Sequence, residues 1–242
     1  VNDYKSFRDI PIKSGTSKLS VALSLGTLSS RQIAWALTQT GHSLAESTYF
    51  SEILWREFYK YLLYFRPELC LSNAFNDKWD KFPWRREPEL LECWQKGETG
   101  VPLVDAAMRQ LNNTGWMHNR VRMIASSFLI KHLLIDWREG EKWFWDTLLD
   151  ADYGSNAVNW QWGAGTGVDS NMFVRIMAPL TQSEKFNAGN YIRKWVSELS
   201  NLDDPYIHDP EEHGCRPRGY PTKIIGHREG RERALDAYQQ VK

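Results

Sequence analysis

Apolar residues recur at helical spacing along most of this 242-residue chain. The longest amphipathic segment covers roughly 44–65, where apolar side chains return every third or fourth position until Pro67 closes it. Signals for β-strands are sparse, because the chain has no clear alternating runs and no Asn-Gly hairpin. Further helices are predicted over 88–96, 101–113, 118–136, 139–149, 184–199 and 228–240. The pattern therefore predicts an all-α, multi-helical fold in which residues 1–242 form one domain.

Short polar sequences mark several of the expected helix ends. Residues 16–20, Thr-Ser-Lys-Leu-Ser, precede an apolar stretch and suit a hydroxyl N-cap, and residues 29–32 open a second helix in the same way. Gly115 follows the 101–113 segment and suits a left-handed C-cap. These signals predict separate helices joined by turns.

One stretch, 150–171, departs from the helical pattern because it is rich in glycine and asparagine. A long glycine-rich loop inside a helical domain is usually functional, and a disordered connector is the alternative. Trp160 and Trp162 argue against disorder, since disordered linkers are poor in aromatic residues. We therefore predict a functional loop. If the segment around these two residues is extended, their indoles point to opposite sides, one towards the interior and one towards a cleft.

The aromatic content is unusually high, with 12 Trp, 10 Tyr and 10 Phe. Tryptophan is seldom accumulated for packing alone, because its indole N–H needs a partner when it is buried. A tryptophan-rich core is one interpretation, and stacking on bases or a planar cofactor, or electron transfer, is the other. The 30 basic and 30 acidic residues cancel, which excludes a nonspecific polycation but is compatible with a local basic face.

The cysteines and the start of the chain give information about the cellular compartment of the protein. Cys70, Cys93 and Cys215 are odd in number and far apart, and no spacing typical of metal ligands occurs. The chain begins without an initiator Met, which indicates a fragment of a longer protein, and it contains no signal peptide or bilayer-length apolar run. We therefore expect no metal, no membrane and a soluble intracellular protein, in the cytoplasm of a bacterium or the nucleus of a eukaryote.

A hydroxyl cluster near the N-terminus is a weak candidate for a phosphate site. Thr16, Ser17 and Ser20, with Lys18 among them, suit a phosphate held by hydroxyls and a helix start. Ordinary helix capping explains such residues more often. The chain contains neither a GxGxxG nor a GxxxxGK[ST] sequence, so the motifs do not support a Rossmann or P-loop site.

The segment around residue 55 combines a carboxylate, an aromatic plane and a guanidinium. Glu52, Trp55, Arg56 and Tyr59 fall on one helix face at positions i, i+3, i+4 and i+7. Such a face suits an aromatic base that is stacked and hydrogen-bonded beside a phosphate. Residue types alone favour the simpler alternative, an i,i+4 salt bridge from Glu52 to Arg56.

The 118–135 segment carries Arg120, Arg122, Lys131 and His132 without any acidic residue. Contact with phosphates and a solvated basic face explain this composition equally well. An apolar stripe is expected on another face of the same helix.

Two carboxylates, Asp150 and Asp152, directly precede the glycine-rich stretch. Paired carboxylates occur in glycoside and metal chemistry, but a metal site needs more oxygen ligands close by. We therefore expect Asp150 to form a salt bridge with Arg122 or another arginine.

Five ordered motifs carry a family resemblance. They are Thr-Ser-Lys-Leu-Ser (16–20), Trp-Arg-Glu-Phe-Tyr (55–59), Thr-Gly-Trp-Met-His-Asn-Arg (114–120), Asp-Trp-Arg-Glu-Gly-Glu (136–141) and Asn-Trp-Gln-Trp (159–162). Over nearly the whole chain, they resemble the C-terminal FAD-binding domain of class I photolyases and cryptochromes. The resemblance implies a helical domain that holds a U-shaped FAD. The family's N-terminal α/β antenna domain is missing here, so the antenna chromophore stays unknown.

The resemblance assigns residues to the flavin. The residues that would bind FAD are Tyr4, Thr16, Ser17, Lys18, Leu19, Ser20, Asn119, Arg122, Asp150, Asp152 and Asn156. Asn156 would face flavin N5 and stabilise the reduced state. Trp84, Trp137 and Trp160 match the family's electron-transfer triad, which photoreduces FAD. Packing is the alternative role for Trp84 and Trp137.

The resemblance also implies repair of UV-damaged DNA. Excited reduced FAD would give an electron to a flipped-out cyclobutane pyrimidine dimer, with Glu52 and Asn156 as catalytic residues. The DNA and substrate contacts would be Glu52, Trp55, Arg56, Tyr59, Asn119, Arg120, Met123, Trp162 and Gln182. Lys131 and the basic 216–233 stretch would touch phosphates together with Arg120. A cryptochrome-like blue-light photoreceptor without repair activity is the alternative, and a monomer is expected.

Four residues favour a cyclobutane-dimer photolyase within the group. Trp55 and Trp162 match its dimer-stacking pair, and Met123 matches the dimer enzyme where (6–4) photolyases resemble a His-rich version. Asn156 is the photolyase choice at the N5 position, where several cryptochromes differ. Departures from the family pattern over 169–179 concern the substrate rim and leave the flavin site intact.

Overall fold

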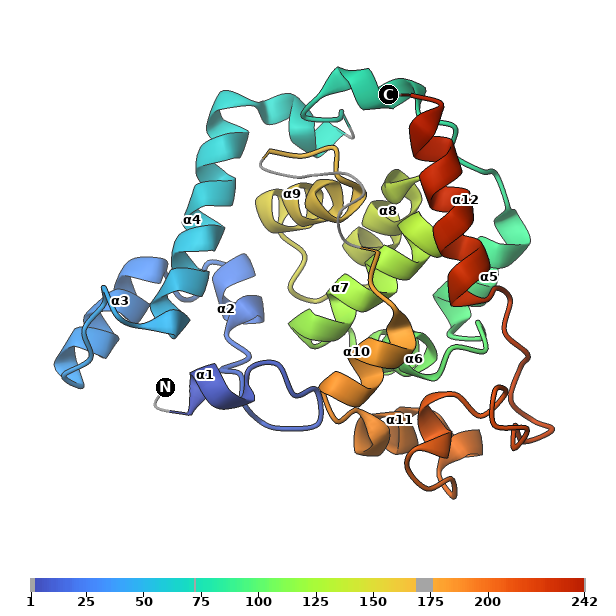
Figure 1. The fold of residues 1–242 in the computed structure, drawn as a ribbon. Coiled ribbons are helices and arrows are strands. Elements are labelled where there is room, and N and C mark those ends of the chain that lie inside the picture. Colours follow the sequence, from blue (N-terminus) through green and yellow to red (C-terminus); the bar gives the residue numbers. More distant parts are fainter. Residues whose placement is uncertain (1–2, 72, 169–175, 242) are drawn as a thin grey trace.

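Helices form the framework of the protein (Figure 1). The computed structural model describes residues 3–71, 73–168 and 176–241, and no β-strand occurs within these ranges. The α-helices of the first half are α1 (Tyr4–Phe7), α2 (Ser20–Ser24), α3 (Ser30–Gln39), α4 (Thr48–Phe65), α5 (Pro88–Lys96) and α6 (Pro102–Thr114). Those of the second half are α7 (Asn119–Ser127), α8 (Trp137–Thr147), α9 (Tyr153–Ala164), α10 (Pro179–Lys185), α11 (Gly189–Trp195) and α12 (His227–Gln239). Short connecting turns are the 3-10 turns η1 (Pro67–Leu71), η2 (Asp77–Lys81), η4 (Ser197–Leu199) and η5 (Tyr206–His208), and the π-helical turn η3 (Phe128–His132). The all-α expectation is confirmed.

Local sequence signals explain several helix ends. At the start of α3, Ser29 and Gln32 form a capping box, in which the Ser29 hydroxyl accepts a hydrogen bond from the Gln32 amide at 3.2 Å. Helices α5 and α6 begin with Pro88 and Pro102, at the position where a missing N–H costs nothing. Gly115 ends α6 in the left-handed conformation, with φ 64°, as predicted.

The single helix expected over 118–136 is wrong in its second half. Helix α7 widens into the π-helical turn η3, where the Leu133 amide bonds back to the Phe128 carbonyl at 3.1 Å. Leu134 then adopts a left-handed conformation with φ 57°, which stops the helix. The Asp136 carboxylate caps α8, so this helix starts two residues earlier than the predicted 139–149 segment.

The helix expected over 184–199 is also interrupted, giving α10, α11 and η4. Asn187 takes a left-handed conformation with φ 52°, which asparagine tolerates better than most residues. Gly189 begins α11 next to the Asp204 carboxylate, and a Cβ at this position would lie 2.4 Å from an Asp204 oxygen. A turn therefore replaces one helical turn of the predicted element.

The glycine-rich loop expected over 150–171 is mostly helix α9, so that prediction is wrong. The Asp152 carboxylate caps its N-terminus. Gly154 lets α9 approach α4 closely, because a Cβ there would stand 3.2 Å from the Tyr59 backbone. Gly165 closes the helix as a left-handed C-cap with φ 82°. The glycines thus serve helix packing and capping rather than a flexible loop.

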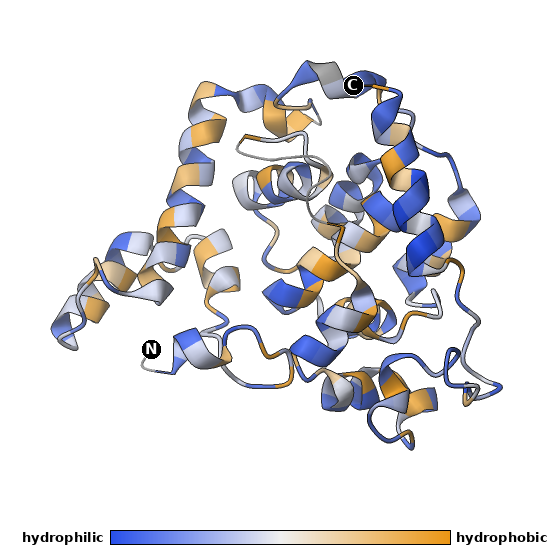
Figure 2. Ribbon diagram, in the orientation of Figure 1, coloured by the Kyte–Doolittle hydropathy of each residue, from blue (hydrophilic) through white to orange (hydrophobic). Residues whose placement is uncertain are grey.

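Helix α6 lies at the centre of the main hydrophobic core. Nearly every residue from Pro102 to Leu111 is buried, and α5, α7 and α11 pack around the helix. The apolar stripe expected on α7 is confirmed by buried Val121 and Ile124. Two smaller clusters flank this core, one between α2, α3 and α4 and one beneath α12. Figure 2 shows hydrophilic residues predominating along α12, and among its few apolar residues Ala234 and Ala237 are buried.

A buried carboxylate ties the start of α6 to the chain beyond α11. Asp105 is fully buried and accepts hydrogen bonds from the Thr99 amide at 2.7 Å, the Thr99 hydroxyl at 2.6 Å and the Gly100 amide at 3.0 Å. The Tyr220 hydroxyl donates a fourth bond. Burial raises the pKa of Asp105, and the hydrogen bonds from Thr99 and Tyr220 oppose that rise.

No helix in the described part of the chain is both long enough and apolar enough to span a bilayer.

Candidate functional site

A cavity of about 960 Å³ opens between α4, α7 and α9, with α1 and α2 at its other side. This volume lies at the upper end of the range of about 300–1,000 Å³ typical of ligand pockets. Most residues singled out from the sequence line it: Tyr4, Ser17, Leu19, Ser20, Glu52, Trp55, Arg56, Tyr59, Asn119, Arg120, Arg122, Met123, Asp150, Asp152, Asn156, Trp160 and Trp162. Segments that lie more than a hundred residues apart in the sequence therefore line one cavity.

Five other expected site residues lie outside the cavity wall: Thr16, Lys18, Trp84, Trp137 and Gln182. The Lys18 ammonium lies 5.1 Å from the ring centre of Trp116, which is a cation–π contact. The rim segment 169–175 lies outside the described residues, so the departures noted there have no structural account. The cavity wall resumes at Met177.

The inward face of α4 carries the expected set of functional groups. Glu52, Trp55, Arg56 and Tyr59 all line the cavity, which confirms that they share a face. Trp55 is half exposed and stacks on Tyr59, with ring centres 6.1 Å apart and planes 29° apart. The salt bridge expected between Glu52 and Arg56 is wrong. Arg56 instead bonds to Asp152 at 2.8 Å, which ties α4 to α9.

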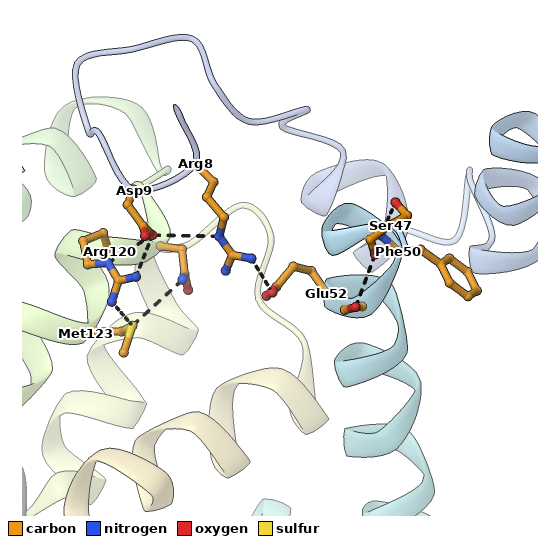
Figure 3. A network of polar contacts seen from close by, with 9 residues as sticks. Arg8, Asp9, Ser47, Phe50, Glu52, Arg120 and Met123 are labelled. Atoms are coloured by element: carbon orange, nitrogen blue, oxygen red, sulfur yellow. Dashed lines mark hydrogen bonds and ion pairs between the residues drawn. The ribbon is translucent and has the colours of Figure 1, made fainter. Parts of the chain in front are cut away.

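Glu52 takes its partner from the N-terminal segment (Figure 3). Its carboxylate accepts a hydrogen bond from Arg8 at 2.5 Å. Asp9 in turn accepts from Arg120 at 2.6 Å, and Arg120 also lies 3.6 Å from the Met123 sulfur. Charges thus alternate along one edge of the cavity and neutralise one another. Sequence reasoning missed Arg8 and Asp9, because no local pattern relates them to partners 44 and 111 residues away.

Arg122 and Asp150 form the ion pair that was expected. The guanidinium makes two parallel bonds to the carboxylate, at 3.1 and 2.8 Å, and a third to the Met117 carbonyl at 2.7 Å. The Asp150 side chain is only 4% exposed. Bidentate geometry fixes the plane of the guanidinium, so this pair holds the start of α9 against α7 and presents a rigid polar wall to the cavity.

Asn156 lies in the second turn of α9 and faces the cavity. Its amide nitrogen donates to the backbone carbonyl of Glu141 on α8 at 3.0 Å. Because that bond uses the nitrogen, the amide oxygen is the atom oriented for a ligand donor. The side chain of Glu141 is a buried carboxyl group. Burial raises the pKa of Glu141 to about 7, and the positive charge of Arg138 opposes this rise more weakly.

We expect Glu141→Gln to flatten the pH dependence of stability between about pH 4.5 and 7. The pKa of Glu141 is raised from 4.5 to about 7 on folding, so its stabilising contribution is complete below pH 4.5 and is lost as pH rises towards 7. The loss is on the order of 3 kcal/mol at full titration. Urea unfolding across this range measures it, with Glu139→Gln on the exposed side of α8 as the control. A wild-type curve as flat as that of Glu141→Gln would contradict the assignment.

The hydroxyl cluster does not cap α2 as expected. The N-cap residue is Leu19 and makes no side-chain capping bond, so the prediction of a hydroxyl cap is wrong. The cause is the left-handed conformation of Lys18, with φ 55°, which turns the chain before the helix. Ser17 instead accepts a hydrogen bond from Tyr49 at 2.9 Å. Ser17 and Ser20 nevertheless reach the cavity wall, where their hydroxyls suit a phosphate or ribose.

Two of the basic residues expected to face phosphates or solvent do neither. Lys131 and His132 are 2% and 0% exposed, so both alternatives are wrong for them. The Lys131 ammonium bonds to the Ala164 carbonyl at 3.1 Å, and His132 shares a hydrogen bond with His227 at 2.8 Å. They follow Phe128 by three and four residues, so they continue the face of the buried stripe formed by Val121, Ile124 and Phe128.

The three tryptophans that were expected to transfer electrons lie in or against the aromatic part of the core. Trp160 is buried, with its ring centre 4.9 Å from that of Phe144 and 6.2 Å from that of Trp94. Trp137 is fully buried in the same core, and Trp84 packs against it from the outside. The premise of an extended 160–162 segment is wrong, since it is helical. Positions i and i+2 of a helix still point to opposite sides, so only Trp160 enters the core.

The cavity residues fit a flavin dinucleotide. Ser127 presents a buried hydroxyl that has no hydrogen-bond partner among the described residues and lines the wall. Trp160 and Phe144 supply an apolar surface for a planar ring, while Ser17 and Ser20 supply hydroxyls. A buried hydroxyl without a hydrogen-bond partner lowers the free energy of unfolding unless a ligand forms that hydrogen bond.

The family model of the FAD-binding domain of DNA photolyase matches residues 49–240. The chain belongs to this family. It is 44% identical over 248 residues to the deoxyribodipyrimidine photo-lyase of Escherichia coli K12 and 48% identical over 252 residues to that of Agrobacterium fabrum. Each alignment covers 99% of this chain and 52% of the relative. The photolyase-type domain therefore spans about half the length of these curated relatives.

Solved structures agree with the family assignment. The crystal structure of a bacterial class III photolyase from Agrobacterium tumefaciens superposes with a TM-score of 0.92 at 48% identity, over 99% of this chain and 52% of that one. A cryptochrome from Synechocystis superposes with a TM-score of 0.87 at 34% identity, over 98% of this chain and 52% of that one. The multi-helical FAD-binding fold is thus common to repair enzymes and to a cryptochrome.

Proposed function

We propose that this domain is the FAD-binding, catalytic half of a deoxyribodipyrimidine photo-lyase that repairs cyclobutane pyrimidine dimers in DNA. The observation that carries the proposal is the single cavity that joins Trp55 and Trp162 to Glu52, Met123 and Asn156. Flat aromatic surfaces, a carboxylate and an oriented amide are the groups needed to receive a flipped-out pyrimidine dimer beside a flavin. Relatives named as deoxyribodipyrimidine photo-lyases support the same activity.

The residues that would hold FAD come from four segments. Ser17 and Ser20 would form hydrogen bonds to its phosphates or ribose. The Arg122–Asp150 pair would form the polar wall beside its ring system. When bound in its reduced form, FAD supplies the light-driven electron transfer. The Asn156 oxygen would accept a hydrogen bond from a ring N–H, because the Glu141 carbonyl already engages the Asn156 nitrogen.

The substrate dimer would enter from the α4 side of the cavity. Trp55 would stack on one face of it, and each base–aromatic contact of this kind contributes about 1–3 kcal/mol. Glu52 would accept hydrogen bonds from the base edges, with Arg8 fixing its carboxylate. No proton transfer is needed to split a cyclobutane ring, so these residues act by binding and orientation.

The subfamily remains a sequence-based prediction. The motifs predict class I, whereas the Agrobacterium tumefaciens structure at 48% identity is that of a class III photolyase. Met123 and the Trp55–Trp162 pair support dimer repair, since all three line the cavity. UV-damaged DNA is the proposed partner. Three basic residues of the 216–233 stretch bond to the protein itself, namely Arg216, Lys223 and Arg233. We place the DNA contacts around Trp55 and Arg120, because these two line the cavity.

Light-dependent repair is the test. The purified domain is loaded with FAD, reduced chemically, mixed with an oligonucleotide that contains one thymine dimer, and exposed to blue light. We expect intact thymines to reappear in the light and not in the dark, as measured by chromatography of the digested oligonucleotide. A matched dark sample is the control. Bound FAD without repair would overturn the proposal and favour a photoreceptor.

A further inference from the structure

We propose that Asp9 determines the preference for damaged DNA by restraining Arg120 at the edge of the cavity. Restrained in this way, Arg120 engages a nucleotide that enters the cavity and not the backbone of undamaged DNA outside it. The inference rests on the proposed function, because that function makes Arg120 a DNA contact. Sequence reasoning assigned no role to Asp9.

The Asp9 carboxylate occupies one edge of the Arg120 guanidinium (Figure 3). Its Oδ1 atom accepts hydrogen bonds from Nε at 3.2 Å and from Nη2 at 2.6 Å. The remaining nitrogen, Nη1, lies 3.6 Å from the sulfur of Met123, which is a weak acceptor. Arg120 and Met123 line the cavity, whereas Asp9 does not. The donor that stays available for a stronger acceptor is therefore Nη1, beside a residue of the cavity wall.

A second contact fixes the plane of the same guanidinium. The Arg120 Cζ atom lies 4.8 Å from the ring centre of Phe186, which is a cation–π contact. Phe186 is itself buried, so it forms a rigid support. Arg120 cannot extend into solvent without losing the contact with Phe186 and both hydrogen bonds to Asp9.

The turn that carries Asp9 is folded against the rest of the N-terminal segment. The Arg8 amide donates to the Tyr4 carbonyl at 2.8 Å, at the end of α1. Gly15 packs on Phe7, where a Cβ would stand 2.6 Å from the Phe7 carbonyl oxygen. These contacts hold the Asp9 carboxylate in place, so it can restrain another side chain.

The charges at this edge of the cavity cancel one another. Arg8 and Arg120 are paired with the carboxylates of Glu52 and Asp9. An arginine without such a partner attracts any DNA phosphate, and this attraction supplies nearly all non-specific DNA binding. Asp9 cancels the attraction for a duplex that lies outside the cavity. A nucleotide flipped into the cavity reaches Nη1 of Arg120 directly, where a charge-assisted hydrogen bond acts at short range.

Fluorescence anisotropy in the dark tests the proposal, with FAD-loaded protein and labelled oligonucleotides that contain or lack one thymine dimer. We expect Asp9→Asn to bind undamaged DNA about 3- to 10-fold more tightly, because one negative charge a few ångströms from a phosphate is removed. The slope of log K against log salt should steepen by about 0.9, since Arg120 then neutralises one more phosphate. Affinity for the dimer should change less, so the preference for damaged DNA should fall.

Three further variants separate charge, position and mechanism. Asp80→Asn is the matched control, because Asp80 is half exposed, pairs with Arg138 at 2.6 Å and does not line the cavity. It should keep the wild-type preference. Asp9→Glu retains the charge and should keep the wild-type affinity for undamaged DNA. Asp9→Asn combined with Arg120→Gln should lose the gain in affinity, because Asp9 acts through Arg120.

Arg120→Gln alone gives an independent decision, including the case in which Asp9→Asn does not fold. A restrained Arg120 predicts that this variant weakens binding of the dimer more than binding of undamaged DNA. Equal weakening of both, or equal changes of both affinities in Asp9→Asn, would overturn the inference. These binding measurements need no light. A protein that passes them and fails light-dependent repair would overturn the proposed function and leave the role of Asp9 standing.

Discussion

Trp55→Ala is expected to weaken binding of dimer-containing DNA by about 5- to 150-fold while leaving FAD bound. One base–aromatic stacking contact contributes about 1–3 kcal/mol, and Trp55 presents a half-exposed indole to the cavity. The fold should not suffer, because the residue is outside the buried core. Fluorescence anisotropy with a labelled oligonucleotide, with and without a thymine dimer, gives the two dissociation constants.

Tyr61→Ala is the matched control for this substitution. Tyr61 is another exposed aromatic residue of α4, 60% exposed, and it does not line the cavity. Its removal should leave both affinities unchanged. If Trp55→Ala weakened binding of undamaged and damaged DNA to the same extent, Trp55 would be a general DNA contact rather than a dimer-stacking residue.

Asp105→Asn is expected to lower the free energy of unfolding by about 2–6 kcal/mol. One carboxylate oxygen accepts bonds from the Gly100 amide and the Tyr220 hydroxyl. An amide nitrogen in that place would face two donors, and each buried donor left unpaired costs about 1–3 kcal/mol. Tyr220 is itself buried, so water cannot replace the lost acceptor. Urea unfolding followed by tryptophan fluorescence measures the change.

Glu92→Gln provides the comparison for stability. Glu92 forms an exposed i,i+4 pair with Lys96 at 2.6 Å, and pairs of this kind contribute little to stability. Its midpoint of unfolding should match that of the wild type. A midpoint for Asp105→Asn equal to that of Glu92→Gln would show that the buried network around Thr99 and Tyr220 does not stabilise the fold.

The site was predicted best where its residues lie on one helix. Glu52, Trp55, Arg56 and Tyr59 share a face of α4 because the helical repeat alone places them there. The same reasoning failed for their partners. It paired Glu52 with Arg56, whereas the folded chain pairs Glu52 with Arg8 and Arg56 with Asp152. Opposite charges four residues apart often pair on an isolated helix, but buried partners from other segments compete with that local geometry.

The glycine-rich segment shows where composition misleads. Glycine indicates flexibility in an isolated chain, but Gly154 and Gly165 serve close helix packing and a C-cap in α9. Whether glycine loosens or tightens a segment depends on what lies beside it, here the backbone of Tyr59. Residue type misled in the same way for Lys131 and His132, because both are basic and yet lie on the buried face of the segment with Ile124 and Phe128.

Helix content, several helix ends, the shared face of α4 and the family resemblance all follow from residue order, because capping, periodicity and ordered motifs act over a few positions. The cavity does not follow from residue order. It exists only where α4, α7 and α9 meet, with Arg8 lining one edge and Asp9 bonded to the lining residue Arg120. The stack of Trp79 on Tyr238 likewise joins residues about 160 positions apart. Such contacts depend on how helices pack. The free energy of packing is shared among many side chains, so the contacts cannot be predicted from a short stretch of sequence.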